Sequence, residues 1–262
     1  MPALRDAIYG LAVGDALGVP YEFRPRGSFT CMGMVGHGTH DQPAGTWSDD
    51  TSMTLATCDS IRACGHVDVG DMRSRFRAWI DDGAYAIDGV VFDYGSTTAR
   101  ALAAGTGRAG ERDNGNGSLM RIAPLAFTDA TDDEVRAVSA ITHAHRVSTE
   151  ACVDMVHVMR ALAAGASPAE AVPDVDVLLA ASEKDLRSGG FVRDTYCAAL
   201  WCLAVSGSYE ECVLRAVNLG DDTDTTAAVA GALAGIAYGV EGIPIGWLSG
   251  LRGKDIIERC LF

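Results

Sequence analysis

Hydrophobic residues recur along this chain at the three- and four-residue spacing of α-helices. The clearest example is the face made by Met155, Val158, Met159 and Leu162, which occupy positions i, i+3, i+4 and i+7. The sequence contains no period-two strand of convincing length and no alternation of strands with helices. The pattern predicts an all-α fold, with helices near residues 3–18, 51–64, 72–82, 96–104, 132–142, 195–205, 209–218 and 225–238.

Two of these segments depart from the ordinary amphipathic pattern. Residues 225–238 are apolar nearly all round, which is typical of a central buried helix. In residues 3–18, Gly10, Gly14 and Gly18 recur at every fourth position. Each Gly costs about 1 kcal/mol of helix stability relative to Ala. We interpret the bare face as one that another backbone approaches closely.

Three segments between the predicted helices are rich in Gly and polar residues, namely 22–47, 105–118 and 183–191. Loops of this length in a compact domain are more often functional than decorative. We therefore expect these three loops to meet around one site.

Acidic residues gather at two points where a Gly-rich approach leads into a predicted helix. The first acidic cluster is residues 48–51, and the second is residues 221–226. One Ser, Thr or Asp is enough to cap a helix, because few backbone N–H groups there need an acceptor. Asp221, Asp222 and Asp224 exceed that need and repel one another, which favours a bound cation.

For Asp49 and Asp50 in the first acidic cluster, a negatively charged first turn stabilised by the helix dipole is an equally good explanation. The second cluster shifts the balance, because both offer carboxylates and hydroxyls without a thiolate or imidazole. Such oxygen ligands select Mg, Mn or Ca rather than zinc. The two clusters are therefore expected to converge on one or two divalent cations.

Residues 222–226 also match two other motifs. DxDxT is the nucleophile loop of haloacid-dehalogenase phosphatases, but it requires a buried strand before it, and residues 216–220 continue a helical segment. An EF-hand loop counted from Asp222 needs Gly at its sixth position and Glu at its twelfth. Those positions hold Ala227 and Leu233, so neither motif is favoured.

Three further features have ordinary explanations when taken alone. The turn at residues 114–118 could bind an anion through its backbone N–H groups, or be a simple tight turn. His143 and His145 are too close in sequence to share a helix face, and each is by default a satisfied structural histidine. A lone Glu22 on a loop is usually without function.

The composition narrows the class of protein. The chain has 262 residues, of which 48% are hydrophobic and 21% charged, as in a folded globular protein. No linker divides it, so we expect one domain over 1–262. The formal net charge of -14 argues against nucleic acid or an anionic membrane as a partner. No apolar run approaches membrane-spanning length.

The N-terminal segment and the cysteines indicate a cytoplasmic location. Asp6 and Asp15 interrupt the only apolar stretch near the N-terminus, and no basic region precedes it, so a signal peptide is not expected. The eight Cys form no CxxC pair. In a chain of this size we expect them to be mostly buried free thiols.

Five motifs, taken together and in order, resemble the ADP-ribosylglycohydrolase family. This family includes the dinitrogenase-reductase-activating glycohydrolase and the ADP-ribosyl-acceptor hydrolases. The resemblance runs from about residue 5 to about residue 250. The motifs are Gly14-Asp15-Ala16-Leu17-Gly18, Ser48-Asp49-Asp50-Thr51-Ser52-Met53, Asn116-Gly117-Ser118-Leu119-Met120-Arg121, Thr142-His143-Ala144-His145 and Gly220-Asp221-Asp222-Thr223-Asp224-Thr225.

The resemblance implies a single-domain orthogonal helical bundle with two divalent cations, Mg²⁺ or Mn²⁺, in a cleft. It implies catalytic roles for Glu22 and Asp93. Two departures from the family pattern are Ser48 in place of Thr, which keeps a hydroxyl, and Asp221 in place of Gly. The implied metal ligands are Ser48, Asp49, Asp50, Asp222, Asp224 and Thr225, and the implied substrate-binding residues are Asn116, Gly117, Ser118 and His143.

The activity implied is metal-dependent hydrolysis of the glycosidic bond between ADP-ribose and an acceptor, most simply a protein side chain. The acidic protein would suit a cationic arginine acceptor better than an acidic one. Two alternatives stay open at this point: hydrolysis of a small conjugate such as O-acetyl-ADP-ribose, and a non-catalytic ADP-ribose-binding module.

Overall fold

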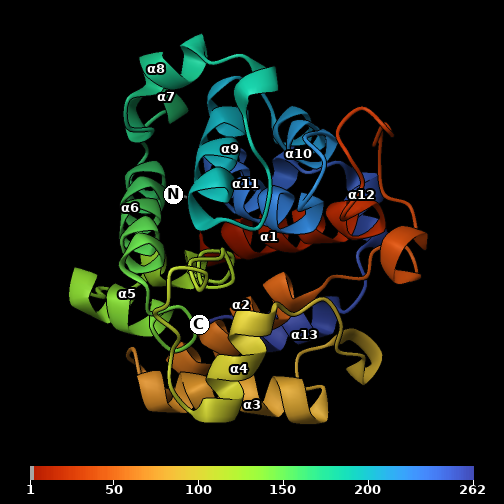
Figure 1. Cartoon of the computed structure of the whole chain (residues 1–262). Coiled ribbons are helices and arrows are strands. Elements are labelled where there is room, and N and C mark those ends of the chain that lie inside the picture. Colours follow the sequence, from red (N-terminus) through yellow and green to blue (C-terminus); the bar gives the residue numbers. More distant parts are fainter. Residues whose placement is uncertain (1–2) are drawn as a thin grey trace.

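The computed structural model describes residues 3–262 and consists of helices joined by loops (Figure 1). Strand-like pairing within this range is limited to three isolated bridges, at 37 with 42, 108 with 143 and 115 with 191. The prediction of an all-α fold is confirmed. The α-helices are α1 (Leu4–Gly18), α2 (Asp49–Cys64), α3 (Val69–Asp82), α4 (Ser96–Ala104), α5 (Asp132–Ser139), α6 (Arg146–Ala163), α7 (Pro168–Ala171), α8 (Val175–Ala180), α9 (Val192–Ala204), α10 (Tyr209–Asn218), α11 (Thr223–Tyr238), α12 (Ile245–Gly250) and α13 (Lys254–Cys260).

The bare face of α1 packs directly on α11, as its glycines predict. A Cβ atom at Gly10 would lie 2.2 Å from the carbonyl oxygen of Gly231, and one at Gly14 would lie 2.1 Å from that of Ala227. At Gly18 it would lie 2.3 Å from the Cα of Asp224. Real Cβ atoms do not approach so closely, so the two helices can meet at this distance only because these positions lack side chains. The contacts run in opposite directions along the two helices, which are therefore antiparallel.

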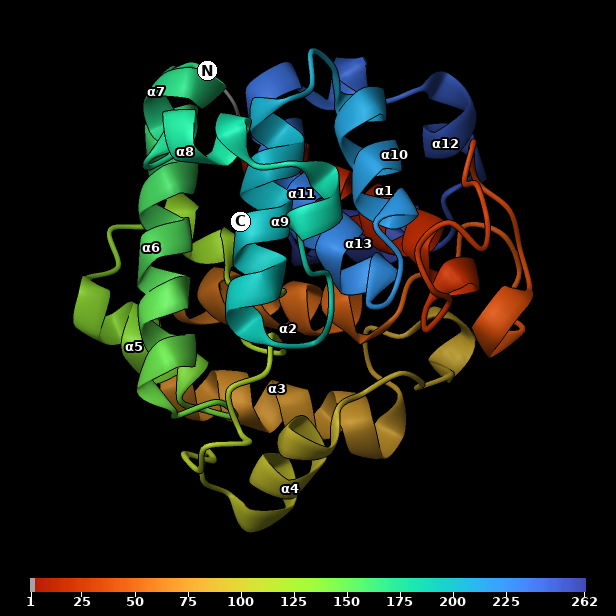
Figure 2. The same ribbon diagram turned by 45° about the horizontal axis from the view of Figure 1, so that its top comes forward.

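Helix α11 is the central helix of the molecule. Its residues from Thr223 to Ile236 are all buried, as expected for a segment that is apolar on every side. Helices α1, α9 and α10 pack on it. Helix α2 packs on α1 and α11, α3 packs on α2, and α4 packs on α3, so the three lie in succession away from the core (Figure 2). Near its C-terminal end, α1 contacts the start of α11 through Gly18 and the start of α2 through Asp15. The first turns of α2 and α11 therefore lie close together.

Sequence periodicity did not predict four short helices, α7, α8, α12 and α13, which have between four and seven residues. It also extended α5 to residue 142, whereas the helix ends at Ser139. The chain leaves the helix here because Thr142 and Ala144 pair with Arg108: the Arg108 N–H donates to the Thr142 carbonyl at 2.9 Å, and the Ala144 N–H donates to the Arg108 carbonyl at 2.7 Å. This turn carries His143.

The expectation of free and mostly buried thiols is confirmed. All eight Cys are unpaired, and only Cys64 and Cys197 are not buried. Within residues 3–262, no helix is both long and apolar enough to cross a membrane.

Candidate active site

Asp15 on α1 caps the start of α2. Its carboxylate is fully buried and accepts hydrogen bonds from the backbone N–H groups of Ser48 at 2.9 Å and Thr51 at 3.0 Å. It also accepts from the hydroxyls of both residues, at 2.9 and 2.6 Å. Two backbone donors at the start of α2 are thus satisfied from outside the helix. Asp49 and Asp50 are therefore not needed as caps of α2, and their carboxylates are available for another partner.

The second acidic cluster is fixed by the end of α1 and by two loops. The Thr223 hydroxyl donates to the Gly18 carbonyl at 2.8 Å. The backbone N–H of Asp222 donates to the Ser188 carbonyl at 2.9 Å, and Asn116 Nδ2 donates to Asp222 Oδ2 at 2.8 Å. These contacts hold Asp222 at the start of a helix whose position the α1–α11 packing already determines.

The two acidic clusters converge, as the sequence predicts. Carboxylate oxygens of Asp15, Asp50 and Asp224 lie within 4.8 Å of one another, and so do those of Glu22, Asp222 and Asp224. Two hydroxyl oxygens lie beside Asp50 Oδ2: that of Ser48, whose proton is directed to Asp15, at 3.2 Å, and that of Thr225, which donates to it at 3.4 Å. Residues more than 170 positions apart in the chain therefore face one another across the α2–α11 junction.

Burial raises the pKa of each of the aspartates Asp15, Asp49, Asp50, Asp222 and Asp224. The pKa values of Asp49, Asp50 and Asp224 stand well above their ordinary range, first because burial disfavours the charged form and then because neighbouring carboxylates repel it. Burial likewise raises the pKa of Asp222, and that of Asp15 to about 6. The group is therefore electrostatically unstable as a set of anions without a counter-charge.

A divalent cation fits this group of residues. Asp50 Oδ1, Asp222 Oδ1 and Asp224 Oδ2 are buried and have no hydrogen-bond partner among residues 3–262. Buried polar atoms are rarely left unpaired, because desolvation without a partner is costly. A cation would supply both the missing partner and the missing charge. Carboxylate and hydroxyl oxygens suit Mg, Mn or Ca.

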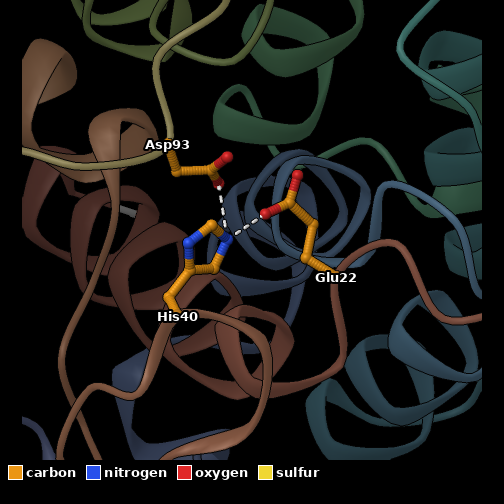
Figure 3. A group of neighbouring side chains, drawn as sticks. All are labelled: Glu22, His40 and Asp93. Carbon is orange, nitrogen blue, oxygen red and sulfur yellow. Dashed lines mark hydrogen bonds and ion pairs between the residues drawn. The ribbon is translucent and has the colours of Figure 1, made fainter.

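Glu22 and Asp93 lie beside these clusters and share a histidine (Figure 3). His40 Nε2 is hydrogen-bonded to Glu22 and lies 3.7 Å from Asp93 Oδ2. Burial is the largest cause that raises the pKa of Glu22 to about 7 and that of Asp93 to about 10, and burial lowers the pKa of His40. Both carboxyls are therefore able to carry a proton near neutral pH in this environment.

The turn that carries His40 is pressed against the chain before Glu22. Gly38 has a φ of +71°, and a Cβ atom there would lie 2.0 Å from the carbonyl oxygen of Pro20. The hydroxyl of Thr39 donates to the Glu22 carbonyl at 2.7 Å. His40 is thus held by its backbone as well as by its ring, and the Glu22 side chain is fixed against it.

A cavity of about 340 Å³ opens onto these residues. We call Glu22, Asp49, Asp93 and Asp222 its acidic wall, and Gly115, Asn116, Gly117 and His143 its donor wall; all eight line the cavity. Gly190 lines it too. Each of the three Gly-rich loops therefore contributes lining residues, which confirms that they meet at one site.

On the donor wall, Gly117 and His143 are in close contact. A Cβ atom at Gly117 would lie 2.8 Å from His143 Cε1, so a side chain at 117 would displace the ring. The amide of Asn116 already donates to Asp222 and to Thr195 at 2.9 Å. Ser118 does not line the cavity: its hydroxyl is fully buried and contacts the Ser139 hydroxyl at 2.9 Å.

A sequence model of the ADP-ribosylglycohydrolase family matches residues 3–261. The chain belongs to the ADP-ribosylglycohydrolase family. It is 33% identical to the ADP-ribosylarginine hydrolase Tri1 of Pseudomonas putida, covering 97% of this chain and 76% of that protein. It is 34% identical to an ADP-ribosyl-dinitrogen-reductase glycohydrolase of Rhodospirillum rubrum, covering 98% and 94%.

The fold agrees with this assignment. A solved structure described as an ADP-ribosylglycohydrolase-related protein complex superposes on the chain with a TM-score of 0.83 at 32% identity. The alignment covers 98% of this chain and 94% of that one. The family resemblance inferred from the five motifs is confirmed.

Within this glycohydrolase-family site, sequence reasoning missed the roles of Asp15 and His40. Asp15 stands in a quoted motif, but its sequence neighbours are small residues of a helix, which do not show which partner it caps. His40 lies alone in a Gly-rich loop, and nothing in the sequence links it to Glu22. Asp221, whose role the sequence left open, is exposed and has a φ of +59°, so its carboxylate is outside the buried group.

Proposed function

We propose that this protein hydrolyses the bond between ADP-ribose and an arginine side chain of a protein. Family membership and the two relatives named above support this reaction class. The observation in the structure that supports it most directly is a group of three buried carboxylate oxygens that have no hydrogen-bond partner in the described range 3–262. They lie where the two acidic clusters border a cavity. We also propose that residues 1–262 form one domain, which supplies every residue of the site.

We propose two divalent cations, Mg²⁺ or Mn²⁺, as the cofactors. When bound, such cations orient ribose hydroxyls and water and neutralise the carboxylates. The residues that would hold them are the buried oxygen donors of the two clusters: Ser48, Asp49, Asp50, Asp222, Asp224 and Thr225.

Glu22 and Asp93 are the proposed acid–base residues. Water attacks the anomeric carbon of the ribose while its bond to the guanidine nitrogen breaks through an oxocarbenium-like state. One carboxylate accepts the proton of the attacking water, and the leaving nitrogen gains a proton. Both side chains line the cavity, and both lie within 4 Å of His40 Nε2. Either carboxyl is therefore placed to act as the acid or the base. His40 is hydrogen-bonded to one oxygen of the Glu22 carboxyl and so fixes its orientation (Figure 3).

The donor wall is the proposed binding surface for the rest of ADP-ribose. Gly117 allows close approach of a ligand to the backbone, and His143 adds a ring nitrogen. Ser118 would act through its backbone N–H, since its hydroxyl is committed elsewhere. The amide of Asn116 braces Asp222, so Asn116 links the donor wall to the acidic wall.

An arginine acceptor suits the charge of the site. The leaving group is a guanidine that becomes cationic, and the cavity presents carboxylates on the side where the bond breaks. The chain as a whole carries a formal charge of -14, which disfavours an acidic acceptor. The unpaired Cys agree with our proposal of a cytoplasmic location.

The test is release of free ADP-ribose from arginine-linked ADP-ribosylated protein, with Mg²⁺ or Mn²⁺ and with a chelator. We expect metal-dependent release, and little release from glutamate-linked substrate or O-acetyl-ADP-ribose. Asp49→Asn with Asp222→Asn should abolish it, whereas Asp221→Asn, the same change at an exposed neighbour, should not. Preferential cleavage of O-acetyl-ADP-ribose would assign a small conjugate as substrate. ADP-ribose binding without any release would indicate a binding module.

A further inference from the structure

Arg121 is a buried positive charge without a carboxylate partner. Its side chain is fully buried, and it forms no ion pair with any carboxylate among residues 3–262. Its guanidinium carbon lies 4.4 Å above the ring centre of Phe76. Burial lowers its pKa to about 10, so it stays protonated at neutral pH. Burying an unpaired charge is costly, which calls for an explanation of what this residue does.

The guanidinium donates to a hydroxyl beside the donor wall. Arg121 Nη2 lies 2.9 Å from Thr142 Oγ1, and Thr142 is fully buried. Its other contacts are two hydrogen bonds of 3.4 Å to the Val138 carbonyl. Because a guanidinium can only donate, Thr142 Oγ1 accepts this hydrogen bond.

The same hydroxyl contacts the ring of His143. Thr142 Oγ1 lies 2.9 Å from His143 Nδ1. With Arg121 occupying one acceptor position, the hydroxyl proton of Thr142 remains to be placed, and His143 Nδ1 is its one acceptor among the described residues. If Nδ1 carried the proton instead, the hydroxyl proton would be buried without a partner, which is costly. The hydroxyl therefore donates to Nδ1.

A neutral imidazole has one N–H, so an unprotonated Nδ1 places the proton on Nε2. Burial and the nearby charge of Arg121 lower the pKa of His143 to about 3, so the doubly protonated form is absent at neutral pH. The backbone of His143 is also fixed: its N–H donates to the Ser139 carbonyl at 2.9 Å, and its carbonyl accepts from the Ser139 hydroxyl at 3.1 Å.

We propose that Arg121 and Thr142 are positioning residues that hold His143 as its neutral Nε2–H tautomer, so that the ring offers a hydrogen-bond donor to an acceptor oxygen of ADP-ribose. His143 Nε2 would lie 3.4 Å from a Cβ atom at Gly117 and 3.5 Å from one at Gly115, and all three residues line the cavity. The identity of the ligand rests on the proposed function, whereas the tautomer does not. The unpaired charge of Arg121 thereby has a use: a guanidinium can only donate to Thr142, which leaves the Thr142 proton for His143 Nδ1.

The first test is the nitrogen spectrum of the His143 ring in the free protein. Long-range proton–nitrogen correlation of protein labelled with ¹⁵N-histidine distinguishes protonated from unprotonated ring nitrogens, and His143→Gln identifies the signals. We expect a protonated Nε2 and an unprotonated Nδ1 at neutral pH. A protonated Nδ1 would overturn the proposal, whether or not the protein hydrolyses anything.

The second test compares two variants of the hydroxyl. Thr142→Val keeps the side-chain shape and removes the hydroxyl, whereas Thr142→Ser keeps the hydroxyl. We expect Thr142→Val to lose the single tautomer and to bind ADP-ribose roughly tenfold more weakly by calorimetry, as for one lost hydrogen bond. Thr142→Ser should match wild type in both measurements. Equal ADP-ribose affinity in folded Thr142→Val and wild type would contradict the donor role of His143.

The two proposals fail in different ways. If wild-type protein has the Nε2–H tautomer but does not bind ADP-ribose, the proposed function is wrong and the assignment of the tautomer holds. If it binds and hydrolyses ADP-ribosylated arginine but has the Nδ1–H tautomer, the proposed function stands and this inference is wrong.

Discussion

Two residues of the acidic wall, Asp49 and Asp222, lie at the starts of helices α2 and α11, whereas the donor wall rests on a tight turn and a short segment after α5. Those helix starts are fixed by close backbone packing of Gly18 on Asp224 and by the Asp15 carboxylate, which caps α2. The donor wall is fixed by side chains stacked behind it, with Arg121 bonded to Thr142 and Thr142 to His143. The acidic wall concentrates negative charge, whereas the donor wall contains no carboxylate.

This difference explains how an acidic protein can bind an anionic ligand. The carboxylates need a counter-charge, and their unpartnered oxygens are all on the side of the two clusters. At the donor wall, a buried guanidinium lies behind the imidazole of His143, and the turn of Gly117 adds no charge. A ligand with a diphosphate and a ribose can therefore place its anionic part against neutral donors rather than against carboxylates.

A larger hollow elsewhere shows that size alone does not mark the site. It has a volume of about 510 Å³ and is lined by side chains of α6, α8 and α9, among them Val177, Tyr196 and Leu200. Arg193 and Asp154 there are paired with each other at 3.1 Å. This hollow has no convergent carboxylates, so it lacks the chemistry that distinguishes the smaller cavity.

The largest effect is expected on the acidic wall at Glu22. Glu22→Gln removes a proton acceptor and should lower kcat roughly 100- to 10,000-fold, the usual contribution of a general acid–base residue. ADP-ribose affinity should change little, because the donor wall is intact. Steady-state kinetics with ADP-ribosylated arginine measure the first quantity and calorimetry the second. Wild-type kcat in Glu22→Gln would remove Glu22 from the mechanism.

On the donor wall, Gly117→Ala should weaken ADP-ribose binding roughly tenfold, about the cost of one lost hydrogen bond, because the added Cβ displaces the His143 ring. Cation binding should be unchanged. Gly189→Ala is the matched control, since an added Cβ there meets nothing within 4 Å. If both variants bind ADP-ribose as wild type does, the ring of His143 is not part of the binding surface.

Substitution of His40 should lower kcat as substitution of Glu22 does, but by a smaller factor. His40→Leu removes the hydrogen bond to Glu22 and should lower kcat roughly fivefold, consistent with the net value of one hydrogen bond. His40→Gln keeps a donor and should recover most of the loss. KM should be similar in both variants. A change in KM alone would mean that His40 acts on substrate binding rather than on Glu22.

The smallest expected effect is a pH dependence of the melting temperature. It should be seen when no cation is bound to the carboxylates. Carboxyls with raised pKa values stabilise the fold while protonated and lose that contribution as pH rises through their folded-state values, about 6 for Asp15 and about 7 for Glu22. In chelator, the melting temperature should fall between about pH 5 and pH 8 by a few degrees. Saturating Mg²⁺ should remove most of the decline. A flat profile in chelator would contradict the electrostatic account.

Much of the acidic wall could be predicted from the sequence, but little of what holds the donor wall in place. The glycines at positions 10, 14 and 18 indicated close backbone contact, and the excess of carboxylates in the two clusters indicated a cation. Both signals are local in sequence. The contacts of Asp15 with α2 and of Arg121 with Thr142 join residues at least twenty positions apart, and no spacing rule reveals such pairs.

Two other details depended on packing rather than on pattern. Ser118 belongs to a motif that suggests ligand binding, yet its hydroxyl is directed to Ser139 behind the cavity. Helices such as α8 and α13 have too few turns to show a periodic pattern. Their positions are determined by tertiary contacts, which override weak local propensity.

The most direct test of the central claim is calorimetric titration of Mn²⁺ into chelator-stripped protein. Wild type and Asp221→Asn should bind with similar affinity and stoichiometry, because Asp221 is exposed and outside the buried group. Asp49→Asn combined with Asp222→Asn should lose this binding while keeping the helical circular dichroism spectrum. Equal Mn²⁺ binding in the folded double variant and in wild type would show that cations bind elsewhere and that the acidic wall is not a metal site.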